Sequence, residues 1–507
     1  MSGWNQKRSL NVLSQLKAFG VSEVVICPGG RNAPFVDVLS KLSDFKVHSH
    51  FEEREASFYA LGLIKATGRP VAVITTSGTA VAEVLPAVTE AFYSGLPLVL
   101  ISCDRPLGYR FSGAPQAMDQ TQYFDGLLAS KLVDVHEVNE VPALELSLNG
   151  PHVINLCFDE PLIDGVECPA LNDVDFKRVL VEQRPGTALL PSGLKPVVIF
   201  SQMSPSEAEQ VAEVFRDYNG LAYIEAGSQL VGRLSNATRL RHTQQIEAMM
   251  SDVDCVVRIG GVPTLKFWRL LESKYSQLPV SSFSRMAFSG LARSPQPAQA
   301  LSALLSDEFK VWLGSVTPPV CSSDLDLEDL YAAYPLAEPS LVHQISKSIG
   351  HFDRLFLGNS MAIREWDEFA TSSPCGVHAN RGVNGIDGLI STSVGLCKDG
   401  ASVFSLIGDL SAMYGLSGFW PLTKQDLFCL AVINNRGGKI FERLFKNPAF
   451  YNGHNYRFSD LAKFWRLDYA EYVPGSEIQI NGPTLLEVTV DDQQTSDFWE
   501  ELKQRFH

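Results

Sequence analysis

The sequence lacks the features that define several large classes of protein. No apolar stretch approaches the roughly 20 residues that a membrane-spanning helix needs, and the first residues, MSGWNQKRSLNVL, lack the apolar core of a signal peptide. Positive charge is scarce: 42 Lys and Arg against 57 Asp and Glu give a formal net charge of −15, which argues against a general nucleic-acid binder or a binder of anionic membranes. We therefore expect a cytoplasmic protein with no nucleic-acid partner and no integral membrane segment.

Cysteine pairs and common catalytic motifs are also missing. The nine cysteines are scattered without a C-x-x-C pair, and several lie inside apolar runs, so we expect buried, reduced thiols. No G-x-x-x-x-G-K-[ST] loop occurs and no G-x-G-x-x-G follows an apolar run, which weakens ATP and dinucleotide interpretations. The histidines show no metal-ligand spacing, and no serine nucleophile elbow is present.

The chain does contain many short apolar runs, most of them followed by helix-compatible segments. With 507 residues it is too long for one core, and a prior of roughly 150 residues per domain gives about three domains. Continuous apolar runs separated by helices are typical of parallel sheets covered on both faces, so the fold class is α/β. The runs expected to form strands are 23–28, 71–76, 98–103, 152–157, 196–200, 255–260, 354–359, 403–408, 427–434 and 485–490.

Two stretches have the composition of linkers. Residues about 173–195 and about 315–340 are richer in Pro, Ser and charge than their surroundings. Cutting there predicts three α/β domains with parallel sheets at 1–172, 194–316 and 338–507. We find no short-period repeat and no low-complexity tract.

The C-terminal domain has a single carboxylate at the end of an apolar run. In SLIGDLSA the run ends at Gly408-Asp409, and Leu410-Ser411 open a helix-like segment whose small residues would let a phosphate approach. The next run ends at Asn434-Asn435, followed by RGG. Carboxylate, carboxamide and backbone carbonyl oxygens are ligands suited to Mg²⁺. The simpler alternative is that Asp409 caps a helix and the Asn pair makes a turn.

The spacing of GD and NN resembles the diphosphate–metal motif of thiamine-diphosphate (ThDP) enzymes. That family also needs a glutamate beside the cofactor's aminopyrimidine, which promotes the tautomer that activates the thiazolium carbon. The N-terminal domain offers Glu53 in HSHFEERE, followed at the family's spacing by Ala60, Gly62 and Thr67-Gly68. Alone, this segment would be a solvated helix start. In the family the two signatures meet across a dimer interface, which implies a homodimer or homotetramer.

Longer motifs resemble one branch of the ThDP enzymes. They are PGGRNAP, HSHFEER, TTSGTAVAEVLPAVTEA, CDRP, GAPQAM, GNSMAIR, NRGVNGIDG, GDLSA and NNRGGKIF. They are similar to motifs of the 2-succinyl-5-enolpyruvyl-6-hydroxy-3-cyclohexene-1-carboxylate (SEPHCHC) synthase family of menaquinone biosynthesis, also called the MenD family. The resemblance covers both large domains and is weak in the central one. It implies pyrimidine-binding, central and diphosphate-binding domains, and a transferase that decarboxylates 2-oxoglutarate and performs a 1,4-addition to isochorismate.

The resemblance also implies roles for individual residues. Because both substrates are polyanions, the pocket is expected to be cationic. Substrate contacts are expected from Arg31, Arg105, Gln116, Lys266, Ser360, Arg364 and Arg381, together with the catalytic Glu53. Cofactor contacts are expected from Glu53, Ile386, Gly408, Asp409, Leu410, Ser411, Asn435, Gly437, Ile440, Phe441 and Leu444. Asp409, Asn435 and Gly437 would hold Mg²⁺ or Mn²⁺.

Four positions depart from the family pattern. Gly30 replaces a common serine, Pro115 a common asparagine, Phe267 a second basic residue, and Arg436 a small polar residue. The first three concern substrate contacts, which leaves open another ThDP-dependent 2-oxo acid decarboxylase or carboligase with a different acceptor. A third alternative is a catalytically silent ThDP-fold subunit, although the intact Glu53, Asp409 and Asn435 argue against it.

Overall fold

The computed structural model describes residues 4–163, 171, 177–178, 189–293, 297–317, 325–374, 376–442, 445 and 447–506. Within this part of the chain lie three large, wholly parallel sheets, and all ten predicted strands are present in them. The chain divides into two compact units. Unit 1 comprises Met1–Glu182, Gly385–Gly400 and Met413–Asp426, and unit 2 comprises Gln183–Asn384, Ala401–Ala412 and Leu427–His507. The predicted α/β class with parallel sheets is confirmed.

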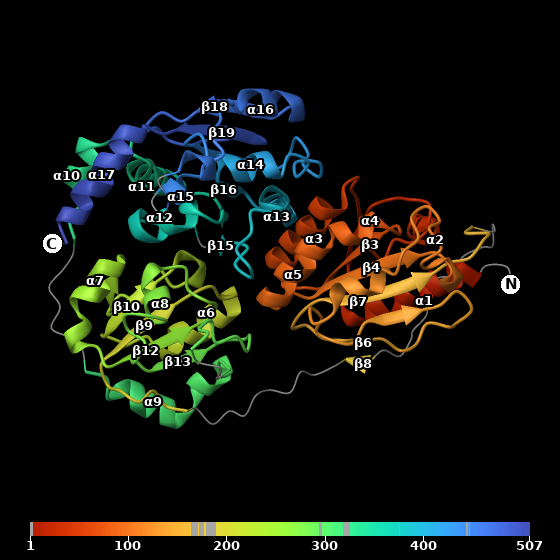
Figure 1. Ribbon diagram of the computed structural model, residues 1–507, viewed down its shortest axis with the longest axis horizontal. Coiled ribbons are helices and arrows are strands. Elements are labelled where there is room, and N and C mark those ends of the chain that lie inside the picture. The colour runs from red at the N-terminus through yellow and green to blue at the C-terminus, as the bar shows by residue number, and fades with distance from the viewer. Residues whose placement is uncertain are drawn as a thin grey trace. The chain divides into compact units, whose positions relative to one another are not determined.

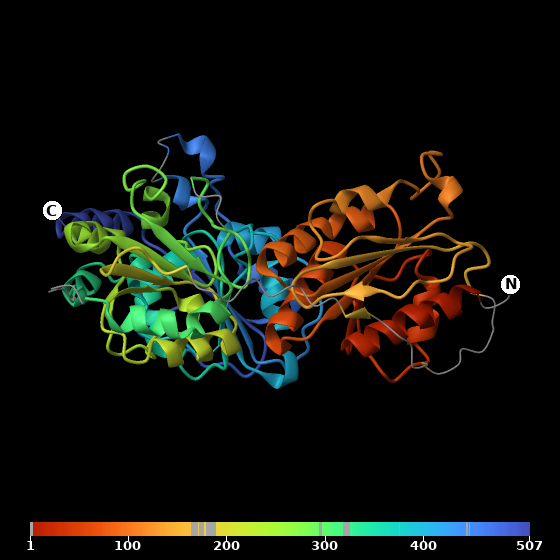
Figure 2. The same ribbon diagram turned by 90° about the horizontal axis from the view of Figure 1, so that it is seen from below.

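The first sheet forms the core of unit 1 and has the order β2-β1-β3-β4-β7-β5. Its strands are β1 (Glu23–Ile26), β2 (Lys46–Ser49), β3 (Val71–Thr75), β4 (Leu98–Asp104), β5 (Val133–Val135) and β7 (His152–Cys157). Alternate strand residues point to opposite faces. One face packs against α1 (Trp4–Phe19) and α2 (Ala33–Leu39), whereas α3 (Glu53–Thr67) and α5 (Leu85–Ser94) cover the other (Figure 2).

The second sheet belongs to unit 2 and has the order β11-β10-β9-β12-β13. Its strands are β9 (Pro196–Phe200), β10 (Leu221–Ile224), β11 (Thr238–Leu240), β12 (Cys255–Ile259) and β13 (Val280–Phe283). Helices α6 (Pro205–Val214) and α9 (Asp307–Gly314) pack in one hydrophobic cluster, and α7 (Thr243–Ala248) and α8 (Lys266–Leu270) pack in another on the opposite face (Figure 1).

The third sheet, also in unit 2, has the order β15-β14-β16-β17-β19-β18. Its strands are β14 (Arg354–Leu357), β15 (Gly376–His378), β16 (Val403–Gly408), β17 (Phe428–Asn434), β18 (Asp468–Glu471) and β19 (Thr484–Thr489). Helices α11 (Glu338–Ser348) and α12 (Met361–Phe369) bury their apolar sides against it. The remaining α-helices and strands of the described residues are α4 (Thr79–Glu83), α10 (Glu328–Ala333), α13 (Leu389–Gly395), α14 (Asp409–Tyr414), α15 (Lys439–Glu442), α16 (Ser459–Trp465), α17 (Asp492–Gln504), β6 (Glu145–Leu146) and β8 (Lys177–Arg178).

The first and third sheets share one topology. If the strands of each are renumbered from one to six in chain order, both read 2-1-3-4-6-5. In each sheet the second and third strands lie on opposite sides of the first strand, so the direction of strand addition reverses there. Ligands of open α/β sheets usually bind at the carboxyl end of the strands beside such a reversal. The sequence showed no repeat that would have announced this correspondence.

Two features of the domain organisation differ from simple cutting at the linkers. Helix α10 lies inside the second predicted linker, and its Leu330 is buried with Phe498 and Leu502 of α17. Helix α13 belongs to unit 1, where its backbone packs directly against α3. The two helices are so close at Gly62 that a Cβ there would lie only 2.2 Å from the Thr392 carbonyl oxygen. Backbones approach this closely only where glycine leaves the space. Each predicted domain contains one large sheet, and the boundaries themselves stay a prediction.

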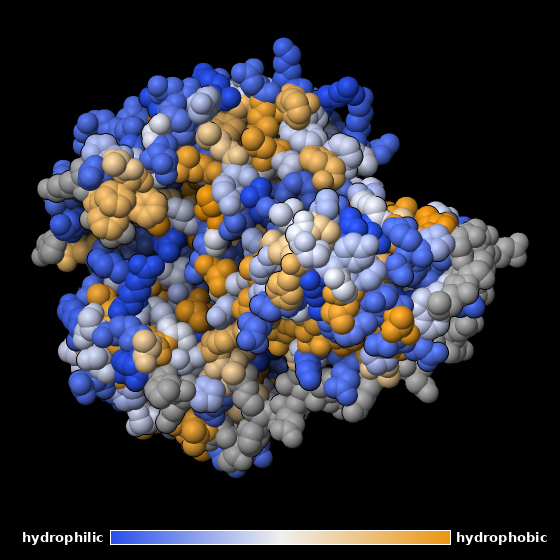
Figure 3. Space-filling view, turned by 45° about the vertical axis from the view of Figure 1, so that its right-hand side comes forward, coloured by the Kyte–Doolittle hydropathy of each residue, from blue (hydrophilic) through white to orange (hydrophobic). Residues whose placement is uncertain are grey.

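Surface and thiol features can be stated for the described residues. In this part of the chain, no helix is both long and apolar enough to cross a membrane. Hydrophobic side chains appear among hydrophilic ones on the face drawn in Figure 3. Cys27, Cys103, Cys157, Cys255, Cys397 and Cys429 are buried free thiols, as predicted, whereas Cys168, Cys321 and Cys375 lie outside the described residues.

Candidate active site

Glu53 lies at the carboxyl edge of the first sheet, at the start of the helix that follows β2. The helix is capped by Glu52, whose carboxylate accepts the backbone N–H groups of Arg54 and Glu55, both at 3.1 Å. Glu53 is therefore released from capping. Its side chain is half-buried, and burial raises the pKa of its carboxyl above the usual value, partly offset by its own backbone N–H. A half-buried carboxyl with a raised pKa is suited to share a proton with a ring nitrogen.

Helix α3 is held in place by buried polar groups on both sides of Glu53. Glu55 is fully buried and accepts a hydrogen bond from Ser391 of α13, and burial raises the pKa of Glu55 to about 7. Before the helix, Nδ1 of His50 accepts the Glu52 N–H at 3.1 Å, and burial lowers the pKa of His50 to about 4. His48 pairs with Glu23 at 2.6 Å. These contacts give both histidines a structural role.

Arg31 lies beyond β1 at the same edge of the first sheet. Its Nη1 donates to the Phe158 carbonyl at 2.9 Å and lies 3.5 Å from a carboxylate oxygen of the exposed Glu160. Its backbone N–H donates to Oγ1 of Thr76, which follows β3. The guanidinium is thus oriented by backbone rather than by a buried carboxylate.

Arg105 and Gln116 lie on the loop after β4. Asp104 ends the strand, and its Oδ1 accepts the Arg105 N–H at 2.8 Å. The Arg105 guanidinium stacks over the Tyr109 ring at 5.4 Å. Gln116 has a left-handed φ of 52° and is exposed, and its backbone packs against Gly78 after β3. The structure thus brings the predicted substrate residues of the N-terminal domain to the ends of β1 and β4.

Asp409 is the first residue of α14, where β16 ends. Its Oδ2 accepts the Gly437 N–H at 2.9 Å and lies 3.1 Å from Nε2 of His454, and its Oδ1 accepts the Leu410 N–H at 2.6 Å. Only 2% of Asp409 is exposed, and burial raises the pKa of its carboxyl. The side chain therefore joins α14 to the loop after β17 instead of capping N–H groups further along its own helix, which disfavours the simple cap alternative.

Asn435 supplies the strongest structural indication of a cation site. It is buried, and its Nδ2 donates to Oε2 of Glu338 at 2.9 Å, while its Oδ1 has no hydrogen-bond partner among the described residues. An orphaned buried amide oxygen is costly unless a cation or donor uses it. Asp409 and Asn435 both contribute oxygen atoms of the kind Mg²⁺ prefers, so these residues fit the metal that ThDP enzymes require. The Gly437 carbonyl accepts the Lys439 N–H at 2.9 Å, and its role as a ligand stays a prediction.

The space around Asp409 and Asn435, at the ends of β16 and β17, is open at Gly408 and flanked by apolar groups. A Cβ on Gly408 would meet nothing within 4 Å. A Cβ on Gly438 would lie 3.2 Å from the Phe441 ring and 3.6 Å from Cδ1 of Leu410, so these side chains share one surface. Ser411 is buried, Ile440 is half-buried on α15, and Phe441 is 40% exposed. The predicted Leu444 lies outside the described residues. Ile386 is half-buried and belongs to unit 1.

Ser360, Arg364 and Arg381 come together beyond β14. Arg364 Nη1 donates to the Ser360 carbonyl at 2.5 Å, and Arg381 Nη1 donates to Oδ1 of Asn359 at 2.7 Å. Ser360 has a left-handed φ of 74°, a costly conformation for a serine that often marks functional sites. Burial lowers the pKa of Arg364, and the nearby Arg269 adds to this effect. Two guanidinium groups at one strand end form a basis for binding a carboxylate.

Lys266 begins α8 in the central domain and is exposed. The next residue, Phe267, is fully buried in the hydrophobic cluster beneath this helix. The family's second basic residue is therefore replaced here by a core side chain. Within unit 2, Asp367 of α12 accepts the Ala226 N–H at 2.7 Å, which anchors the helix that carries Arg364 to the central domain.

Several residues of these corners were not among the predicted site residues. His454 and Glu338 contact Asp409 and Asn435 from sequence separations of 45 and 97 positions. No local pattern could indicate them, because their partners are fixed only when the strands assemble. Arg436 has a left-handed φ of 64°, a conformation that Asn tolerates better. With Asn434, Asn455, Tyr456, Arg457 and Thr489, Arg436 lines a cavity of about 370 Å³.

Comparison with known proteins agrees with this geometry. Residues 10–123 match the family described as thiamine pyrophosphate enzyme, N-terminal TPP binding domain. A 2-succinyl-5-enolpyruvyl-6-hydroxy-3-cyclohexene-1-carboxylate synthase of Bdellovibrio bacteriovorus is 36% identical over 98% of both chains. The synthase of the same name from Akkermansia muciniphila is 32% identical over 96% of both chains.

A solved structure supports the fold at lower identity. It is the X-ray structure of a proposed thiamin diphosphate-dependent enzyme isolated from Mycobacterium smegmatis. It aligns with a TM-score of 0.67 at 16% identity and covers 96% of this chain and 99% of that chain. The two proteins thus share one fold.

Proposed function

The chain belongs to the SEPHCHC synthase family, and from that premise we propose that it decarboxylates 2-oxoglutarate and adds the remaining four-carbon unit to isochorismate in a 1,4-addition. The product would be 2-succinyl-5-enolpyruvyl-6-hydroxy-3-cyclohexene-1-carboxylate, an intermediate of menaquinone biosynthesis. The chain is thus a ThDP-dependent enzyme of the carboligase class. The observation that carries the specific reaction is the 36% identity over 98% of both chains.

ThDP supplies, when bound, a thiazolium carbon that can attack a 2-oxo acid and stabilise the negative charge left by decarboxylation. Glu53 would hydrogen-bond the aminopyrimidine and hold the proton that this ring exchanges. Its release from helix capping and its raised pKa support this role.

Asp409 and Asn435 would hold the divalent ion, Mg²⁺ or Mn²⁺, against the diphosphate. The Oδ1 of Asn435, which has no hydrogen-bond partner in the described part of the chain, and the buried carboxylate of Asp409 support the assignment. Gly408 leaves room for the diphosphate, and Leu410, Ile440 and Phe441 would form the apolar side. His454 would keep Asp409 oriented.

The substrate carboxylates would be bound by arginines. Arg31 and Arg105 lie at one sheet edge, and Arg364 and Arg381 at another, with Gln116, Ser360 and Lys266 as further polar contacts. The Arg31 and Arg364 guanidinium groups donate to backbone carbonyls, the Arg381 guanidinium donates to the Asn359 amide oxygen, and the Arg105 guanidinium stacks on the Tyr109 ring. Guanidinium groups can bind a carboxylate through two parallel hydrogen bonds. Ile386 would support the cofactor's bent conformation.

Glu53 and Asp409 belong to different units, and we propose that two copies of the chain complete the site as a homodimer or a higher assembly. Exposed apolar groups next to Glu53 support this proposal: Phe51 is 56% exposed, Trp420 47%, and their rings lie 4.9 Å apart. Large exposed aromatic groups are typical of interfaces. We also propose a cytoplasmic enzyme, because the buried free thiols suit a reducing compartment.

One assay tests the reaction. The protein is incubated with ThDP, Mg²⁺, 2-oxoglutarate and isochorismate, and both substrates and the product are followed by mass spectrometry. We expect consumption of both substrates in equal amounts. Consumption of 2-oxoglutarate with isochorismate untouched would instead favour a carboligase with another acceptor, which the buried Phe267 and the family departure at Gly30 motivate. Calorimetry that detects no ThDP binding with Mg²⁺ would indicate a silent subunit.

A further inference from the structure

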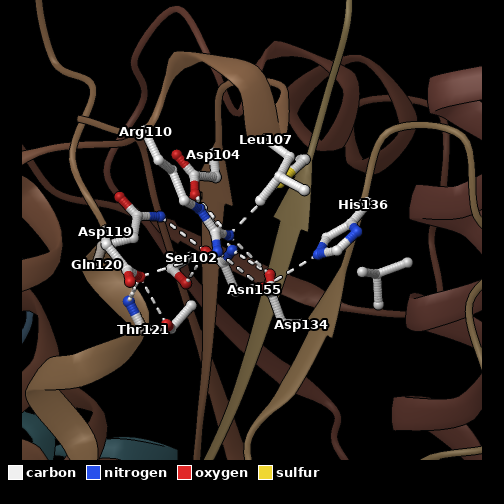
Figure 4. A network of polar contacts seen from close by, with 12 residues as sticks. Ser102, Asp104, Leu107, Arg110, Asp119, Gln120, Thr121, Asp134, His136 and Asn155 are labelled. Atoms are coloured by element: carbon white, nitrogen blue, oxygen red, sulfur yellow. Dashed lines mark hydrogen bonds and ion pairs between the residues drawn. The ribbon is translucent and has the colours of Figure 1, made fainter. Parts of the chain in front are cut away.

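Two arginines of the loop after β4 differ sharply in their surroundings. Arg105 begins the loop and Arg110 lies five positions later. Only 10% of the Arg110 side chain is exposed, and it points inward to a cluster of polar side chains on β4, β5 and β7 (Figure 4). Arg105 stacks on the Tyr109 ring and forms no ion pair within the part of the chain that the structure describes.

Arg110 is bound on two sides by carboxylates. Its two terminal nitrogens donate to the two oxygens of Asp134, both at 2.9 Å, in a bidentate arrangement. Nη2 also donates to Oδ2 of Asp104 at 3.2 Å, and Nη1 lies 3.8 Å from Asp119. Burial opposes the charge, but the contacts with Asp134 raise the pKa of Arg110 above its usual value. Bidentate pairs of this kind fix both position and direction.

The charges around Arg110 do not balance without it. Asp104 is 1% exposed, and burial raises the pKa of its carboxyl despite the hydrogen bond from Asn155. Hydrogen bonds from Arg110 and Asn155 lower the pKa of Asp134 in spite of burial. His136 lies 3.4 Å from Asp134. Without Arg110, the carboxylates of Asp104 and Asp134 would lose the guanidinium that pairs with both of them. Arg105 follows Asp104 directly in the sequence and is therefore a nearby cation that could replace it.

The same cluster extends to the turn that supports Gln116. Asn155 is fully buried; its Nδ2 donates to Asp134 at 2.8 Å, and its Oδ1 accepts Ser102 and Gln120, each at 2.8 Å. Gln120 in turn accepts the Gly78 N–H at 3.1 Å. A Cβ on Gly78 would lie 3.2 Å from the Gln116 Cα. The start, middle and end of the loop are therefore tied to one network.

We propose that Arg110 is a positioning residue that occupies Asp104 and Asp134 and so leaves the Arg105 guanidinium available to a carboxylate of an anionic substrate. The inference rests on the proposed function for its substrates. Loss of Arg110 lets Arg105 turn toward the vacated carboxylates, so substrate binding weakens although every proposed contact residue is still present. This is coupling between neighbouring charges, which a double-mutant cycle measures.

The test combines Arg105→Met, Arg110→Met and the double variant, with the exposed Arg69→Met as the matched control. For Arg105→Met, KM is measured for each substrate, and the substrate whose KM rises is the one that Arg105 binds. We expect Arg110→Met to raise the KM for the same substrate by about 10- to 100-fold, the loss typical of a displaced group, with a smaller change in kcat. When Arg110 is already Met, the additional Arg105→Met change should raise this KM by less than about threefold. Arg69→Met should behave as wild type.

Two further variants separate charge from packing. Arg110→Met combined with Asp134→Asn removes the vacated carboxylate and should recover part of the lost affinity, while Arg110→Lys, which cannot pair bidentately, should fall between wild type and Arg110→Met. Multiplicative effects of Arg105→Met and Arg110→Met, or no recovery with Asp134→Asn, would overturn the proposal.

A readout without turnover separates this inference from the proposed reaction. Hydrogen exchange of a peptide covering residues 105–119 should be faster in Arg110→Met than in wild type, and slower again when Asp134→Asn is added. Unchanged exchange would contradict the positioning role even in a fully active enzyme. If wild type consumes neither substrate, the reaction is wrong, and the exchange result alone then decides whether Arg110 holds this loop.

Discussion

The first and third sheets have the same strand order, yet they place their carboxylates at different corners. In the first sheet Glu53 follows the second strand in chain order, is half-buried and heads a helix capped by its neighbour Glu52. In the third sheet Asp409 follows the third strand, is 2% exposed and accepts hydrogen bonds from Leu410 and Gly437. Topology thus provides equivalent positions, and side-chain chemistry assigns them different tasks.

The difference in surroundings explains the difference in task. A carboxyl group that exchanges a proton must not be saturated with donors, because hydrogen bonds to the charged form lower its pKa. A carboxylate that binds a cation must be fixed in direction before the ion arrives, which the N–H groups and His454 accomplish for Asp409. The third-strand corner of the first sheet instead has Thr76, which accepts the Arg31 N–H.

Replacement of Glu53 by Gln should have the largest effect. We expect kcat to fall by about 10²- to 10⁴-fold, the usual contribution of a general acid–base group, with ThDP affinity almost unchanged. Steady-state kinetics and calorimetry measure the two quantities. The matched control is Glu52→Gln, which removes part of a helix cap and should cost about 1 kcal/mol of stability with far less loss of kcat. Near-normal turnover of Glu53→Gln would remove the role that we assign to it.

Replacement of Asp409 by Asn should act on binding instead. We expect the Mg²⁺-dependent affinity for ThDP to fall by about 10- to 100-fold or more, because the carboxylate charge is lost while the shape is kept. Calorimetric titration with ThDP at fixed Mg²⁺ measures this loss. The exposed Asp460→Asn in α16 is the control and should bind as wild type. Equal affinities for Asp409→Asn and wild type would rule out the ligand role.

The buried carboxyl of Glu55, two residues after Glu53, allows the effect of burial on its pKa to be tested through the pH dependence of stability. Because burial raises the pKa of folded Glu55 to about 7 from the ordinary 4.5, the unfolded chain loses this proton first as the pH rises. Glu55 therefore lowers stability progressively between about pH 4.5 and 7, by up to about 3 kcal/mol. We expect Glu55→Gln to stabilise the protein at pH 8 by about 1–3 kcal/mol and by less at pH 5.

Thermal or denaturant unfolding at both pH values measures this dependence. The exposed Glu140→Gln is the matched control, and its stability should differ from wild type by the same small amount at pH 5 and pH 8. A gain of Glu55→Gln that does not depend on pH would show that the carboxyl is not protonated in the folded protein.

The smallest effect is expected from Gly30→Ser, which restores the residue common in the family. A Cβ at Gly30 meets nothing within 4 Å, so stability should change by less than about 0.5 kcal/mol. Its neighbour provides the contrast, since a Cβ at Gly29 would lie 2.6 Å from the Thr76 Cβ. Gly29→Ser should therefore lower the melting temperature clearly. Similar melting temperatures for the two variants would contradict this description of the first-strand corner.

Much of the fold was predictable because buried parallel strands are continuous apolar runs. The ten predicted runs all form strands, whereas seven other strands of the large sheets were missed. One of these, β10, is internal and buried. The other six are edge strands: β2, β5, β11, β13, β15 and β18. Edge strands are exposed on one side and need no apolar run. Of the site, the motifs indicated Glu53, Asp409 and Asn435, which local patterns and a family resemblance make recognisable. The partners His454, Glu338 and Arg110 could not be predicted, because their contacts cross many sequence positions.

By itself the sequence determined the α/β class, the positions of most strands and the family to which the chain belongs, because these depend on local apolar pattern and on short motifs. Only the tertiary structure decided that the first and third sheets share one topology. It also showed that, among the residues it describes, Asn435 Oδ1 has no hydrogen-bond partner and Arg110 is paired with carboxylates while Arg105 is not. The physical reason is that hydrogen bonding and desolvation depend on which distant groups meet, and strand order, not sequence distance, brings them together.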